Sequence, residues 1–222
     1  MKTKKIVIIG NAGNAKLAHY YFSNDSEYEV VAFSVNEKFI TNKTYCNLPV
    51  VSFENIEIMY PTNKFDVFVA IGYNKMNKIR EQLYFSCKEK GYNLPNYISS
   101  KCSFLSDEEI GDNNLILEDN TIQPFVKIGS NNVFWSGNHI GHDTSIGNNN
   151  FITSHVVISG FCNIKNNTFI GVNATLRDAI TIENETLIAA GAIIMKNTNI
   201  KEVYLPAKTT LFAKLSDKIT IS

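Results

Sequence analysis

The chain has 222 residues, of which 44% are hydrophobic and 19% are charged, so it can bury one large core or two small ones. Its 21 lysines and arginines balance its 21 aspartates and glutamates, which argues against nucleic acid or an anionic membrane as a partner. The apolar run 6–9, which follows the only basic cluster, is too short for a signal peptide or a membrane span, so we expect a cytoplasmic protein.

Residues 1–100 predict a small α/β domain. Apolar runs at 4–10, 30–35 and 65–71 are expected strands, and 16–22 and 75–90 are expected helices. Strands that alternate with helices indicate a parallel, Rossmann-like sheet. Ligands bind such sheets beyond the carboxyl ends of the strands, where glycine lets the backbone approach a phosphate. The turns at 10–14 and 72–74 stand at that edge, although Gly10 and Gly13 fall short of a full GxGxxG motif.

Residues 101–222 carry a strict six-residue repeat of aliphatic or aromatic side chains. Neither a helical period of 3.6 nor a strand period of 2 explains it, and a short fixed repeat indicates a solenoid. The fifteen repeat positions are Ile110, Ile116, Ile122, Ile128, Phe134, Ile140, Ile146, Ile152, Ile158, Ile164, Ile170, Leu176, Ile182, Ile188 and Ile194.

Glycine and asparagine are dense between these positions, and both tolerate the positive φ angles of tight corners. Three hexads would form one triangular coil of 18 residues, so the fifteen hexads predict five coils of a left-handed parallel β-helix. The period is lost at 203–222, which we interpret as a short C-terminal cap, and 92–109 are expected to cap the other end.

Three of the four histidines, His139, His142 and His155, lie in the repeat region. A zinc site would need them to converge. The coil arithmetic opposes this, because no two of them fall in the same column. The four cysteines are far apart in the sequence and form no CxxC pair, so we predict no metal site and no disulfide framework.

The segment 137–147, Gly-Asn-His-Ile-Gly-His-Asp-Thr-Ser-Ile-Gly, follows a small α/β domain. This combination resembles the hexapeptide-repeat sugar O-acyl and N-acyltransferases of the sialic acid O-acetyltransferase, bacillosamine N-acetyltransferase and perosamine N-acetyltransferase type. The resemblance covers nearly the whole chain. It implies acetyl-CoA as co-substrate, a nucleotide-linked aminosugar as acceptor, and a homotrimer with active sites between neighbouring solenoids.

The resemblance implies that His142 is the general base and that Asp143 orients it. An amine must lose a proton as it attacks a thioester, and imidazole has an ordinary pKa near the working pH. The family commonly has asparagine where this chain has Trp135, a second histidine where it has Phe151, and an acid where it has Asn36.

The resemblance also implies two sets of binding residues. The substrate set is Gly10, Asn11, Gly13, Asn14, Asn36, Gly72, Tyr73, Asn74, Arg80, Trp135 and His139. The coenzyme set is His155, Gly160, Asn173, Ala189, Ala190 and Gly191.

We therefore expect an acetyl-CoA-dependent N-acetyltransferase that acts on a nucleotide-linked dideoxyaminosugar in surface glycan or O-antigen biosynthesis. Two alternatives stay open. One is an O-acetyltransferase that acts on a sugar hydroxyl or on an acceptor without a nucleotide, and the other is a non-catalytic solenoid binding module. Exposed aromatic side chains on flat solenoid faces, Phe134 and Phe169 among them, are the residues that we expect a trimer to bury.

Overall fold

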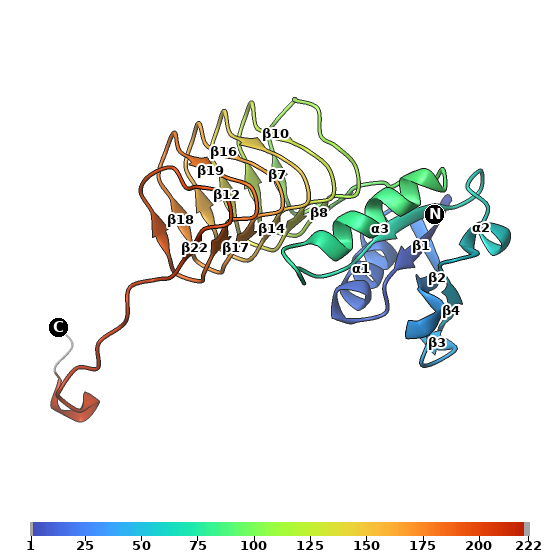
Figure 1. Ribbon diagram of the computed structural model, residues 1–222, viewed down its shortest axis with the longest axis horizontal. Helices are drawn as coiled ribbons and strands as arrows, with labels where there is room; N and C mark the ends of the chain where they lie inside the picture. Colours follow the sequence, from blue (N-terminus) through green and yellow to red (C-terminus); the bar gives the residue numbers. More distant parts are fainter. Residues whose placement is uncertain (1, 220–222) are drawn as a thin grey trace.

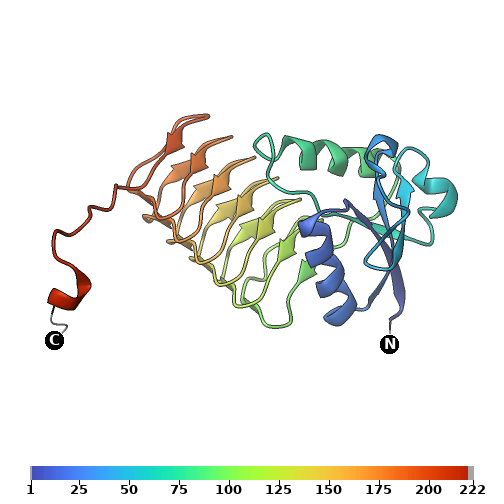
Figure 2. The ribbon, with the colours of Figure 1, turned by 90° about the horizontal axis from the view of Figure 1, so that it is seen from below.

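The computed structural model describes residues 2–219 and contains an α/β domain followed by a long solenoid. The α/β domain lies at one end of the solenoid, and the C-terminal tail extends from the other end (Figures 1 and 2). None of the helices in residues 2–219 combines the length and the apolar character needed to cross a lipid bilayer.

The α/β domain contains a five-stranded sheet with the strand order β3-β4-β2-β1-β5. β2, β1 and β5 are parallel, as the sequence predicted, and β3 pairs with β4 in an antiparallel hairpin. The predicted second helix begins three residues late, because Lys75, Met76 and Asn77 all have positive φ angles. The elements are β1 (Lys4–Ile9), α1 (Gly13–Asn24), β2 (Tyr28–Val35), η1 (Glu37–Phe39), β3 (Thr44–Tyr45), β4 (Leu48–Ser52), α2 (Ile56–Met59), β5 (Asp66–Val69) and α3 (Lys78–Glu89).

The solenoid is a left-handed parallel β-helix with three faces, as predicted. Face 1 contains β6 (Tyr97–Ile98), β8 (Leu115–Ile116), β11 (Val133–Phe134), β14 (Phe151–Ile152), β17 (Phe169–Ile170), β20 (Leu187–Ile188) and β22 (Val203–Tyr204). Face 2 contains β7 (Ser103–Phe104), β9 (Thr121–Ile122), β12 (His139–Ile140), β15 (Val157–Ile158), β18 (Thr175–Leu176) and β21 (Ile193–Ile194). Face 3 contains β10 (Lys127–Ile128), β13 (Ser145–Ile146), β16 (Asn163–Ile164) and β19 (Thr181–Ile182).

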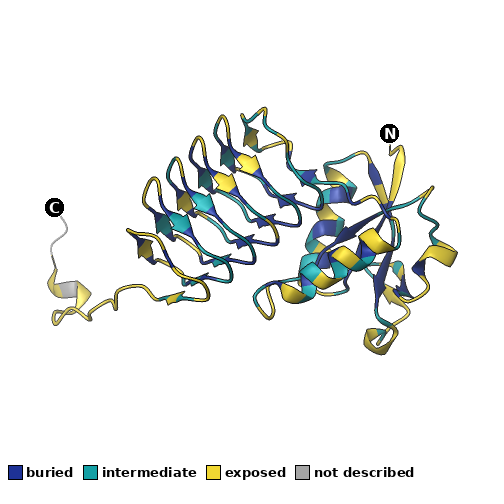
Figure 3. Ribbon diagram, turned by 45° about the horizontal axis from the view of Figure 1, so that its top comes forward, coloured by how far each residue is buried: buried dark blue, intermediate teal, exposed yellow. Residues whose placement is uncertain are grey.

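The side chains at the repeat positions pack together as the core of the solenoid. Buried residues recur along its successive coils (Figure 3). Each strand pairs with the strand one coil on, as Ile140 does with Ile158, so like residues stack along the axis. This placement corrects one expectation, because Phe134 is fully buried in the core and cannot contribute to a trimer interface. Phe169 also has partners in its own chain, since its ring contacts those of Tyr73 and Phe151.

Both ends of the solenoid differ from the predicted caps. At the first end, β6 and β7 already pair with β8 and β9, so residues 97–104 belong to the repeat. At the other end, β22 pairs with β20 at a spacing of 16 residues, from Ile188 to Tyr204, which matches the predicted loss of period. Beyond this strand the chain extends away from the solenoid, mostly exposed, and includes η2 (Ser216–Lys218), so the tail does not close the last coil (Figures 1 and 3).

The α/β domain packs against face 1. One apolar cluster joins Phe22 and Phe33 of the domain to the outward side chains of Leu115, Val133 and Phe151 on the solenoid. Burial of this shared surface holds the two parts together. The domain therefore covers the outward side of the first coils of face 1.

Candidate active site

His142 and Asp143 lie at the corner between faces 2 and 3, after β12 and before β13. The His142 side chain is 51% exposed, and its Nδ1 lies 2.9 Å from Oδ2 of Asp143. A carboxylate at this position favours the tautomer in which Nδ1 donates its proton to Asp143. Nε2, which has no hydrogen-bond partner among residues 2–219, is then the basic atom of the ring.

Hydrogen bonds with the neighbouring coils hold the backbone of His142 in position. The backbone N–H of His142 donates to Oε1 of Gln123 at 2.9 Å, and the carbonyl of His142 accepts from the N–H of Phe161 at 2.9 Å. A Cβ at Gly160 would lie 3.0 Å from Nε2 of His142, so this glycine leaves the room that the ring occupies. Gly160, which we assigned to the coenzyme from the sequence, therefore lies directly beside the base.

The other predicted coenzyme residues gather at a different corner, between faces 1 and 2. His155, Asn173 and Gly191 stack there in one column with φ angles of +58°, +58° and +72°. His155 covers Gly137, where a Cβ would lie 2.6 Å from its ring. Ala190, next to Ala189 and Gly191, stacks on Gly171, whose missing Cβ would lie 2.4 Å from the backbone nitrogen of Ala190.

The predicted substrate turns converge at one edge of the α/β sheet. Gly10 has a φ of +128°, and a Cβ there would lie 3.1 Å from the carbonyl oxygen of Ala70. A Cβ at Gly72 would lie 3.0 Å from Nδ2 of Asn14, so the two turns touch. Gly13 opens α1, with nothing near its missing Cβ. The remaining members of these turns are Asn11, which is half-buried, and Tyr73 and Asn74, which are exposed.

Asn36 lies beside an acid that the sequence reasoning missed. Nδ2 of Asn36 donates to Oε1 of Glu54 at 3.1 Å, and the N–H of Glu37 donates to Oε2 at 3.0 Å. The Ser52 hydroxyl also donates to this carboxylate. These hydrogen bonds, that from Ser52 most of all, lower the pKa of Glu54 to about 2, so the carboxylate is ionised at neutral pH.

Glu54 borders an open groove of about 860 Å³ between η1 and α3. The exposed ring of Phe39 and the ammonium group of Lys75 also line it. Nδ2 of Asn11 donates to the Phe39 carbonyl at 3.5 Å, which joins the groove to the glycine turn. An acid, a cation and an aromatic ring therefore lie beyond the carboxyl ends of β2 and β4.

Arg80, which we expected to bind substrate, is fully buried between the two parts of the molecule. Burial lowers its pKa to about 9, so the guanidinium group remains charged at neutral pH. All three guanidinium nitrogens already donate to protein acceptors, so Arg80 joins the parts and is not available to a ligand. Its acceptors are the carbonyls of Asn131, Gly72, Asn149 and Asn150 and the Oδ1 of Asn77.

Trp135 and His139 are the two solenoid residues that we assigned to the sugar. Trp135 is half-buried against the α/β domain, and its buried indole Nε1 has no hydrogen-bond acceptor in the described part of the chain. His139 lies on face 2, between the corner that carries His155 and the corner that carries His142. Within one chain, the structure does not bring the substrate turns to the base.

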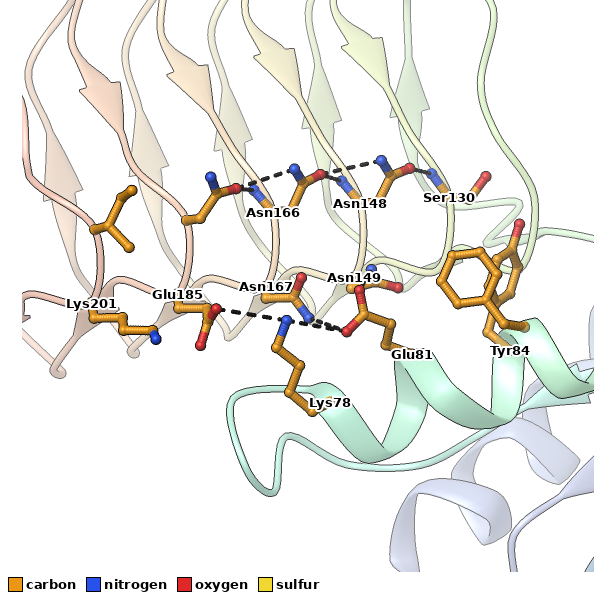
Figure 4. Close-up of a pocket in the computed structure, with 13 residues that line it drawn as sticks. Lys78, Glu81, Tyr84, Ser130, Asn148, Asn149, Asn166, Asn167, Glu185 and Lys201 are labelled. Atoms are coloured by element: carbon orange, nitrogen blue, oxygen red, sulfur yellow. Dashed lines mark hydrogen bonds and ion pairs between the residues drawn. The ribbon is translucent and has the colours of Figure 1, made fainter.

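A second hollow, of about 640 Å³, lies between α3 and the solenoid corner of faces 3 and 1 (Figure 4). Asparagines from successive coils line it and form a ladder of hydrogen bonds (Figure 4). The Oδ1 atoms of Asn148, Asn166 and Asn184 each accept from a backbone N–H one coil earlier, and the amide groups of Asn148 and Asn166 donate to the Oδ1 atom one coil later. Glu81 accepts from Asn149 and Asn167 and pairs with Lys78. These polar groups in the hollow therefore bond to one another. We interpret the hollow as part of the junction between the α/β domain and the solenoid.

Among residues 2–219, no group of three or more His, Cys, Asp and Glu side chains is arranged to hold a metal ion. The four cysteines in this range are free, two of them buried and two half-buried.

Two parts of the chain match known family models. Residues 125–160 match the bacterial transferase hexapeptide model, and residues 5–86 match the PglD N-terminal domain. The resemblance predicted from the sequence is therefore confirmed for both parts and in their order. No curated protein matches the chain.

Solved structures with the same fold include three bacterial proteins. The acetyltransferase domain of PglB from Neisseria gonorrhoeae FA1090 is 22% identical, with a TM-score of 0.81 over 90% of this chain and 96% of that chain. PerB from Caulobacter crescentus, in complex with CoA and GDP-perosamine, is 20% identical, with a TM-score of 0.76 over 90% and 91%. WeeI from Acinetobacter baumannii AYE is 21% identical, with a TM-score of 0.76 over 90% and 96%. At these identities the likeness establishes the fold.

Proposed function

We propose that this protein is an acetyl-CoA-dependent N-acetyltransferase that acts on the amino group of a nucleotide-linked dideoxyaminosugar. The observation that carries the proposal is the exposed His142, whose Nδ1 is held by Asp143 while Nε2 is left open. Surface glycan or O-antigen biosynthesis in the cytoplasm is the corresponding role. PglB has been solved with acetyl coenzyme A and PerB with CoA and GDP-perosamine, which supports the same two substrate classes here.

The reaction moves one proton from the acceptor amine to the departing thiolate, and His142 is placed to carry it. The acceptor amine attacks the thioester carbonyl, so a C–N bond forms and the C–S bond breaks. Nε2 of His142 takes the proton that the nitrogen loses, and Asp143 stabilises the imidazolium ion. The proton then passes to the departing thiolate of the coenzyme, which leaves as the free thiol.

We propose that the acceptor nucleotide lies in the groove beside Glu54, next to the glycine turns. A carboxylate beyond the second strand of such a sheet can accept hydrogen bonds from a ribose diol or a base. Glu54, just beyond the end of β4, supplies this carboxylate, whereas Asn36, just beyond the end of β2, has none. Lys75 supplies a cation for the phosphates in place of the buried Arg80.

In one chain, the proposed nucleotide groove and the proposed base, His142, lie on different sides of the solenoid. The α/β domain covers face 1, whereas His142 lies at the corner of faces 2 and 3, which is opposite face 1 in a triangular coil. An acceptor held by the domain of one chain would therefore meet the base of a neighbouring chain. This geometry supports a homotrimer with active sites between copies.

Release of the coenzyme thiol over a panel of acceptors tests the proposed function. We expect release with nucleotide-linked aminosugars and little release with the same aminosugars without the nucleotide. Release with hydroxyl acceptors would favour the O-acetyltransferase alternative. No release with any acceptor would favour the non-catalytic solenoid.

Glu54→Gln should raise the KM for the nucleotide sugar by about 10- to 100-fold and leave the KM for acetyl-CoA unchanged. The variant removes the charge, and a hydrogen bond to a charged group is worth about 1.5–3 kcal/mol. Glu54 stays ionised down to about pH 2, so it does not titrate between pH 5 and 8. Its ionisation should therefore cause no change in the KM for the sugar over that pH range. Steady-state kinetics with each substrate varied in turn measure both constants.

Glu57→Gln is the matched control, since Glu57 lies three residues further on, pairs with Lys90 and does not line the groove. Both KM values should stay at the wild-type level in this variant. A folded Glu54→Gln enzyme with the wild-type sugar KM would remove Glu54 from the nucleotide site.

A further inference from the structure

The corner between faces 2 and 3 has an unusual sequence. One residue of each coil has a left-handed backbone there, and in successive coils it is Phe125, Asp143, Phe161 and Ala179, with φ angles of +64°, +56°, +60° and +55°. At the corner of faces 3 and 1, asparagine occupies the same conformation in several coils, as at Asn131, Asn149 and Asn167. Asparagine tolerates this conformation, whereas a bulky aromatic residue is strained in it.

The phenylalanine rings are not there to fill the core. Phe125 is 54% exposed and Phe161 is 59% exposed, so neither gains much from burial. Strain that burial does not offset often has a functional reason.

Phe161 contacts the proposed base. Its ring lies edge to face with the imidazole of His142, with centroids 4.9 Å apart and an angle of 86° between the planes. Such aromatic pairs are stabilised beyond the burial of their area. The left-handed backbone at Phe161 therefore directs its ring toward the base.

Without this contact the imidazole would have few restraints. His142 is half-exposed, and within residues 2–219 its side chain has one hydrogen bond, to the exposed Asp143. Gly160 leaves the space in which the Nε2 edge of the ring lies, and Phe161 borders that space. The coil after His142 therefore provides, at Gly160, the space for the imidazole ring and, at Phe161, a side chain that contacts it.

We propose that Phe161 is a positioning residue, which holds the imidazole of His142 in the orientation that directs Nε2 toward the acceptor amine. This inference rests on the proposed function. The left-handed phenylalanine is kept for its contact with the base, at some loss of stability.

Phe161→Asn tests the inference, because asparagine relieves the strain and removes the ring. We expect kcat to fall about 3- to 10-fold, with both KM values unchanged, since aromatic pairs contribute about 0.5–1.5 kcal/mol. We also expect the Tm to rise by about 1–4 °C as the strain is lost. Phe161→Tyr, which keeps the ring, should retain the wild-type kcat.

Phe125→Asn is the matched control, because Phe125 has the same conformation two coils before Phe161 in this column and no ring contact with His142. It should raise the Tm similarly and leave kcat unchanged. In a His142→Ala background, Phe161→Asn should cause no further loss of turnover, because Phe161 acts through His142.

The inference is overturned if Phe161→Asn keeps the wild-type kcat, if it lowers turnover equally in the His142→Ala background, or if Tm and kcat fall together. A wild-type protein that transfers no acetyl group to any acceptor would contradict the proposed function instead. The Tm values of the two asparagine variants would still show whether the phenylalanines are strained.

Discussion

His142→Ala is expected to lower kcat by about 100- to 10,000-fold, the usual loss when a general base is removed. The alanine leaves the attacking amine with no protein group to take its proton. Folding should be little affected, because the side chain is half-exposed and makes no core contact. Coenzyme release and thermal unfolding of the same preparation measure the two effects.

Two further variants serve as references for this loss of kcat. Asp143→Asn should cost less than His142→Ala, because Asp143 orients the ring and does not transfer the proton. Asp178 occupies the position of His142 two coils further along the same corner and is also exposed. Asp178→Ala should retain wild-type turnover. If His142→Ala turns over within a few-fold of the wild type, His142 is not the base.

Co-expression of two variants tests the proposed trimer. A His142→Ala chain keeps its nucleotide groove, and a Glu54→Lys chain keeps its base. If each active site combines the groove of one copy with the base of the next, co-expression of the two chains should restore part of the wild-type turnover at low sugar concentration. No gain over the separate variants would place both groups in one chain.

The solenoid could be predicted from the sequence because its core positions repeat in the sequence itself. Each inward residue, from Ile116 to Ile194, is set by its place in the hexad, and each pairs with a residue 18 positions away. The same arithmetic placed His142 and Gly160 in one column. Local patterns therefore fixed contacts between coils without knowledge of the rest of the fold.

Contacts between the two parts of the molecule could not be predicted in this way. Arg80 is on a helix that an amphipathic pattern would place at a surface, and its burial follows only from how α3 lies against the solenoid. Glu54 lies 18 residues beyond Asn36, and only the strand order, with β4 beside β2, brings the two together. The signal available in the sequence was an acid directly after a strand.

The ends of the repeat show a related limit. The hexad begins earlier than we counted, at Ile98 and Phe104, because both are partly buried and pack against the core although they precede the first regular glycine. The tail beyond Tyr204 has exposed apolar residues, Leu211 among them, and this amphipathic pattern led us to expect a short cap over the last coil. An apolar pattern predicts that a surface can be covered, and it does not say which surface covers it.

Arg80→Met is expected to lower the free energy of unfolding by about 3–5 kcal/mol, the largest loss of stability that we predict for a single residue. Methionine nearly fills the volume but donates no hydrogen bond. Within residues 2–219, the buried carbonyls of Asn131 and Asn149 have no other donor, and each would remain unpaired at the junction between α3 and the solenoid. Denaturant unfolding of the intact protein measures the change.

Lys78→Met is the control on the same helix, since Lys78 makes only surface ion pairs with Glu81 and Glu185 and should cost less than about 1 kcal/mol. Turnover per folded molecule should be unchanged in Arg80→Met, because Arg80 does not line the groove beside Glu54. This separates a structural role from the substrate role that the sequence suggested. An Arg80→Met protein as stable as the wild type, with a raised sugar KM, would mean that the guanidinium group leaves the junction to bind the phosphates.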